Sequence, residues 1–66
     1  MHASILHLLK FFKYDHLPIH LQAVSKPFCD LANHFAAEHP EGNPEVTVAL
    51  RKLLEAKDAA VRSVLP

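Results

Sequence analysis

The chain has 66 residues, of which seven are basic and seven acidic, so its formal net charge at pH 7 is zero. This balance excludes the broad basic surface that duplex nucleic-acid binding requires. The single cysteine, Cys29, excludes an internal disulfide and favours a reducing, cytoplasmic compartment. A chain of this size buries little surface on folding, so we expect oligomerisation to stabilise it.

The first predicted element is an amphipathic helix over residues 3–13. We expect this helix to dock on a neighbouring helix or on a partner protein. Only two lysines accompany its apolar side chains, so we predict no membrane partner, and no segment of the chain is a candidate transmembrane helix. The apolar side chains recur at helical spacing: Ile5, Leu8, Leu9 and Phe12.

A turn over residues 14–18 leads into a second predicted helix over residues 18–39. Pro18 is expected at its first helical position, where the missing N–H costs nothing. Pro27 lies inside this segment and predicts a kink, or a break and restart, because proline cannot donate to the carbonyl four residues earlier. A seam facing a partner helix is predicted from apolar residues spaced 3, 4, 3 and 4 apart: Leu21, Val24, Phe28, Leu31 and Phe35.

The third predicted helix spans residues 44–65. Asn43 is expected to be its N-cap and Pro44 its first helical residue. Asp58 and Arg62, four residues apart, are expected to pair. The apolar arc of this helix is wider than that of a simple surface helix, which indicates a second surface for a partner. The stripe expected to face the same chain is Leu50, Leu53, Leu54, Ala60, Val61 and Val64.

These patterns predict an all-α fold: a single domain over residues 1–66, with a short N-terminal helix followed by an antiparallel helical hairpin that oligomerises. The hairpin follows from the short connection over residues 40–44, because so short a loop forces consecutive helices to lie antiparallel.

No constellation of residues typical of an enzyme is present, and we predict neither catalysis nor a cofactor. His16 and His20 lie four apart, which is half of a helical metal site, but no cysteine or carboxylate follows at zinc spacing. We therefore predict no metal. Cys29 is interpreted as a small buried residue.

Two positions have the chemistry of a nucleotide site. Tyr14 in the turn offers a flat surface for a base, and Lys26 offers a charge for a phosphate. The alternative, which spacing alone favours, is that Tyr14 packs against the first helix. Lys57 falls near the apolar seam of the third helix, where it either extends to solvent or meets an anion between protomers.

The segments FKYDHLP at residues 12–18 and ALRKLLEA at residues 49–56 resemble a family of small helical-hairpin proteins from bacteriophages. Members of that family are sponges that sequester the cyclic nucleotide signals of bacterial immunity, in the anti-CBASS and anti-Thoeris systems. The resemblance covers residues 12–65.

The resemblance implies a non-enzymatic function in the host bacterial cytoplasm: binding cyclic dinucleotides, and in some members cyclic trinucleotides, within a homohexamer. By this resemblance Tyr14, beside His16, would stack on a base and Lys26 would contact a phosphate. Arg62 or Lys57 would add positive charge at a second site. Asp15 departs from the family pattern, which runs directly from tyrosine to histidine, and places a negative charge beside the expected phosphate.

A different class of function remains open alongside the sponge. The apolar N-terminal helix is also what a helical protein–protein interaction module of a phage or prophage would carry. A stable hexamer favours the sponge, whereas a monomer or dimer favours the interaction module.

Overall fold

The computed structural model describes residues 1–66 and contains only helices, so the prediction of an all-α fold is confirmed. Three α-helices are present: α1 (Ala3–Leu9), α2 (Ile19–Glu38) and α3 (Pro44–Ser63). A 3-10 turn, η1 (Lys10–Phe12), continues α1.

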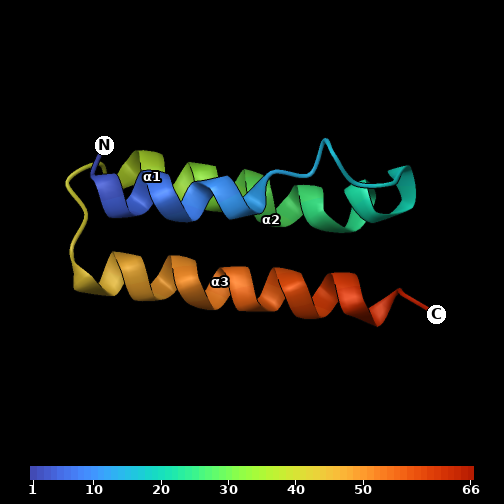
Figure 1. The fold of residues 1–66 in the computed structure, drawn as a ribbon. Coiled ribbons are helices and arrows are strands. Elements are labelled where there is room, and N and C mark those ends of the chain that lie inside the picture. The colour runs from blue at the N-terminus through green and yellow to red at the C-terminus, as the bar shows by residue number, and fades with distance from the viewer.

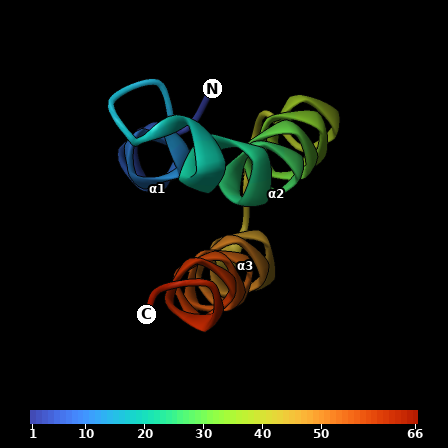
Figure 2. The same ribbon diagram turned by 90° about the vertical axis from the view of Figure 1, so that its right-hand side faces the viewer.

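The helices form an elongated three-helix arrangement of 39 × 18 × 15 Å. The chain runs along α1, returns along α2 and runs back along α3, so that α3 is antiparallel to α2 (Figure 1). Viewed along the helices, the three elements occupy the corners of a triangle (Figure 2). Because α1 is much shorter than its neighbours, it covers only the half of the α2–α3 pair that lies next to their connection.

The start of α3 follows the predicted capping pattern. The Asn43 side-chain oxygen accepts a hydrogen bond from the Val46 backbone N–H at 3.0 Å, and Pro44 opens the helix. At the start of α1 the cap is a histidine: His2 Nδ1 accepts a hydrogen bond from the Ser4 backbone N–H at 3.1 Å. Both caps satisfy amide groups that the first turn of a helix leaves unpaired.

Several helix boundaries differ from the predictions, and α3 ends at Ser63, two residues before its predicted end at residue 65. The first helix does not continue as α-helix to residue 13, because it tightens into η1 at Lys10 and its backbone becomes extended at Lys13. Pro18 is the N-cap of α2 and not its first helical residue. Pro27 does not break α2, which is continuous on both sides of the proline.

The core lies where all three helices meet. It joins large side chains of α1 and η1 to small side chains of α2, and the first half of α3 closes it. Seven buried residues form one cluster: Ile5, Leu8, Phe12, Ala32, Ala36, Val46 and Leu50. Ile5, Leu8 and Phe12 are therefore buried in the protein's own core and are not available to dock on a partner.

The buried face of α2 differs from the seam predicted by the large apolar residues. Leu31 is 53% exposed, while Ser25, Ala32 and Ala36 are fully buried. The reason is that α2 contacts two helices at once, and small side chains let both backbones approach. The Ser25 hydroxyl has no hydrogen-bond partner, so its burial carries a free-energy cost.

The connection between α2 and α3 needs its glycine. Gly42 has a φ of 67°, in the left-handed region that favours glycine. A Cβ atom added there would lie 3.0 Å from the Ile5 Cδ1 atom. The loop therefore depends on Gly42 both for its backbone conformation and for its contact with α1.

The second half of α3 is less covered than the first. Its predicted inward stripe is fully buried only at Leu50, while Leu53 and Leu54 are half-buried and Val64 is 47% exposed. No third helix covers this half of the molecule. None of the helices combines the length and the apolar character needed to cross a membrane.

We expect Ala36→Leu to lower the free energy of unfolding by about 1–3 kcal/mol, because a larger side chain has no room at a fully buried position. The matched control is Ala37→Leu, one residue further along the same helix but exposed, which should change it by less than about 0.5 kcal/mol. Urea denaturation followed by circular dichroism measures both. Equal effects at the two positions would contradict the described core.

Candidate functional site

The turn before α2 carries Tyr14. The turn is tied to α2 by Gln22, whose amide donates to the Leu17 carbonyl at 2.8 Å. Tyr14 is half-buried, and its hydroxyl is one of the groups that raise the pKa of the Lys26 ammonium. The two residues singled out for a nucleotide, a turn aromatic and a lysine on the next helix, are thus within electrostatic reach of each other.

The charge of Lys26 is already balanced. Its Nζ atom lies 2.6 Å from the Asp30 carboxylate, one turn further along α2. The pKa of Lys26 is raised first by that hydrogen bond and then by the negative charge of Asp30. A phosphate at this position would therefore compete with a carboxylate, with Asp15 as a further negative group in the same turn.

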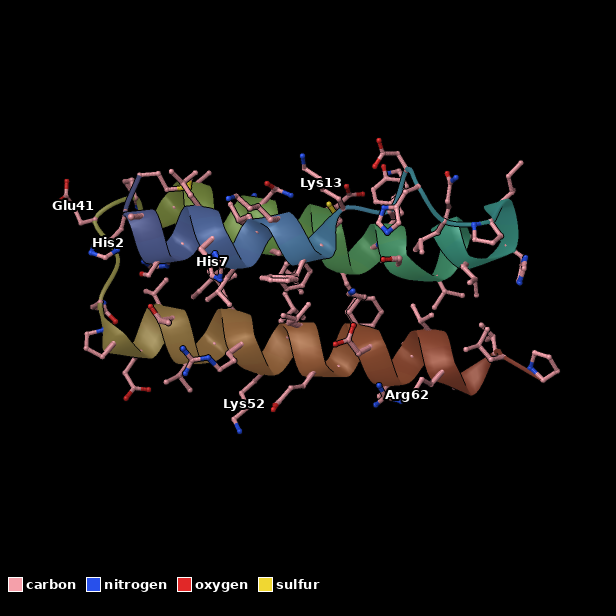
Figure 3. The ribbon with its side chains drawn as sticks, viewed as in Figure 1. His2, His7, Lys13, Glu41, Lys52 and Arg62 are labelled. Atoms are coloured by element: carbon pink, nitrogen blue, oxygen red, sulfur yellow. The ribbon has the colours of Figure 1, made fainter.

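The other predicted site residues do not converge on this pair. His16 is exposed in the turn. Lys57 lies on α3 with its side chain only 13% exposed, and its Nζ atom is 2.9 Å from Asp58. Arg62 is exposed on the last turn of α3 and points away from α1 and α2 (Figure 3).

Three of the seven lysine and arginine side chains, and one histidine, are paired with carboxylates on their own helix. The predicted pair between Asp58 and Arg62 is not formed, because Asp58 lies beside Lys57 instead. Basic residues outside any ion pair are scattered, with Lys13 and Arg62 on opposite sides of the molecule (Figure 3). The four pairs are Lys26–Asp30, His34–Glu38, Lys52–Glu55 and Lys57–Asp58. The single chain thus presents no concentrated positive surface.

A polar hollow of about 260 Å³ lies at the opposite end of the molecule, between the starts of α1 and α3. Its lining includes His2, Ser4, Glu41 and Thr47, and none of the predicted site residues. The Glu41 carboxylate makes it a poor site for an anion, and His2 is already engaged in capping α1.

An apolar groove of about 200 Å³ runs between α2 and α3 on the side away from α1. Every residue that lines it is hydrophobic: Leu31, Phe35, Ala49, Leu50 and Leu53. The sequence analysis placed Leu31 and Phe35 in the intramolecular seam and missed this groove. The available signal was the run of small residues beside the main stripe of α3, which indicated a second surface without locating it.

No group of three or more histidine, cysteine or carboxylate side chains is placed to hold a metal ion. Cys29 is partly exposed, and its thiol accepts a hydrogen bond from the Asn33 side-chain amide at 3.3 Å. Burial of the thiol, followed by the negative charge of Asp30, raises the pKa of Cys29.

Comparison of the chain with protein-family models, with curated proteins and with solved structures finds no match. The resemblance to the phage sponges stays a prediction.

We expect Cys29 to react with a disulfide reagent at pH 8 more slowly in the folded protein than in the urea-unfolded chain, because a raised pKa lowers the thiolate fraction. Asp30→Asn should accelerate the reaction, since it removes a negative charge that raises this pKa. Asp58→Asn, on α3, is the control and should leave the rate unchanged. An unchanged rate in Asp30→Asn would show that the carboxylate does not influence the thiol.

Proposed function

We propose that this chain is a non-enzymatic helical interaction module that acts by binding other protein surfaces, including copies of itself. The observation that carries the proposal is the amount of large apolar surface left uncovered by the fold. Exposed large hydrophobic side chains occur on every helix and at both ends: Met1, Leu6, Phe11, Ile19, Leu31, Val48, Val64 and Leu65. Together with an entirely apolar groove, they are typical of a protein that functions in contact with another surface.

The size of the chain supports the same proposal. Only 9 of 66 residues are buried, and the half of the α2–α3 pair beyond α1 contributes just Leu21 and Ser25 to them. Neither a disulfide nor a metal cluster compensates for this small core. Association is then the remaining means of burying more apolar surface.

We expect the purified protein to associate as its concentration rises from micromolar to millimolar. Sedimentation velocity should show a rising weight-average mass, and the thermal midpoint should rise with concentration, because binding to the folded state stabilises it. A monomer whose midpoint is independent of concentration would contradict self-association.

A specific observation also favours the cyclic-nucleotide sponge as a second candidate. Tyr14 is within electrostatic reach of Lys26, and a sponge needs a base-stacking aromatic beside a phosphate-binding lysine. The sponge further requires a ligand phosphate to replace Asp30 beside Lys26. In the hexamer that the family resemblance implies, Arg62 or Lys57 would add charge at a second site.

Titration calorimetry with cyclic dinucleotides, cyclic trinucleotides and cyclised ADP-ribose tests the sponge directly. We expect Tyr14→Ala to abolish binding by removing the stacking surface. Asp30→Asn should tighten binding several-fold, because it frees the Lys26 ammonium, whereas the control Asp58→Asn should not. Intact ligand released on heating would establish sequestration without hydrolysis. Absence of binding across the panel, in a folded protein, would remove the sponge and leave the interaction module.

A further inference from the structure

The two flanks of α3 differ in chemistry. Thr47 lines the hollow shared with α1, so its flank faces α1. The same flank carries Arg51, one helical turn further along. The opposite flank lines the apolar groove with α2. Residues of that flank recur at intervals of four, three, four and three, and they are apolar or small: Ala49, Leu53, Ala56, Ala60 and Ser63.

Charged residues occur at one end of this second flank. Glu45 and Lys52 are seven residues apart, two helical turns, so they lie on the same edge of α3 with Ala49 between them. All three are exposed. The Lys52 ammonium lies 3.7 Å from the Glu55 carboxylate, and both side chains are about two-thirds exposed or more. Because such an exposed pair is weak, Lys52 can readily exchange Glu55 for another carboxylate.

We propose that a second copy of this chain occupies the apolar groove, with the α3 helices of the two copies antiparallel across a two-fold axis beside Ala49. In that arrangement Glu45 of one copy lies opposite Lys52 of the other, and the symmetry forms this pair twice. The small Ala49 side chains allow the two helix backbones to approach. Leu31 and Phe35, on the α2 side of the groove, are covered at the same time.

Charge also selects this orientation over the parallel one. A two-fold axis along the helices would place α2 of one copy over α3 of the other. Glu38 at the end of α2 and Glu45 at the start of α3 lie at the same end of the molecule, next to the connection. A parallel dimer therefore brings these like charges together, whereas the antiparallel dimer pairs Glu45 with a lysine.

The inference rests on the self-association in the proposed function and adds its site and geometry. Since the axis lies near one end of α3, the helices overlap over only part of their length. The dimer is accordingly a weak, concentration-dependent one.

Exchanging the charges of Glu45 and Lys52 tests the antiparallel orientation of the dimer. E45K alone and K52E alone each convert two attractive pairs into repulsive ones, and each should raise the dimer dissociation constant about tenfold in sedimentation equilibrium. The double variant E45K/K52E restores both pairs and should return the constant to within about threefold of the original. Circular dichroism checks that each variant is folded. Failure of the double variant to restore dimerisation would overturn the antiparallel register.

Two leucines of similar exposure, one in the groove and one outside it, test whether the groove is the dimer interface. Leu31 is 53% exposed on α2 beside the groove, and Leu6 is 50% exposed on α1. Leu31→Lys should abolish the dimer, while Leu6→Lys should leave it intact. The reverse result would overturn the groove as the interface and leave the proposed interaction module standing. A wild-type protein that is monomeric at millimolar concentration would overturn both.

Discussion

The fold depends on the way α1 and η1 pack against both of the longer helices. Ile5 and Phe12 are fully buried, and the α2 residues in the same cluster, Ala32 and Ala36, are among the smallest available. Large residues on one element and small ones on the other allow dense packing without distorting either backbone. Every other property of the molecule follows from this contact, including its asymmetry. The half that contains α1 has a shared core, and the half beyond it has only two helices.

The distribution of charge limits what the single chain can bind. Four carboxylates lie within 4.0 Å of a lysine or histidine on the same helix, three or four residues away or immediately adjacent. Such exposed pairs contribute little stability, but one of them engages Lys26, the cation expected to contact a phosphate. A nucleotide would have to displace Asp30 from Lys26, whereas a protein surface requires no exchange of charge at the apolar groove. For this reason the geometry supports an interaction module more directly than a sponge.

Local signals in the sequence predicted the helices well but did not predict which faces they bury. Asn43, Pro44 and the apolar spacing were sufficient for α3, because capping and periodicity act within one turn. The predicted seam of α2 holds at Leu21, which is buried, and at Phe28 and Phe35, which pack against the core, but it is wrong at Leu31. Leu31 stands out in the sequence, but Ser25 and Ala32 are buried, since two neighbouring helices crowd that side.

For the candidate site, a turn followed by a helix predicted that Tyr14 could act with Lys26, and the two are within electrostatic reach of each other. The neutralising Asp30 was overlooked, although its spacing of four from Lys26 is visible in the sequence. The groove was not predicted, because its lining comes from two helices and exists only once they have packed.

The position of α1 has a consequence for the order in which the chain folds. α2 and α3 are joined by the short connection over residues 39–43, so their contacts close small loops and form quickly. The seven-residue α1 is too short to be stable alone, and the surface that it needs includes Val46 and Leu50 of α3. The α1 segment, which is synthesised before α3, must therefore remain unstructured until α3 has been synthesised. During that interval its apolar side chains are open to any partner present, a chaperone included.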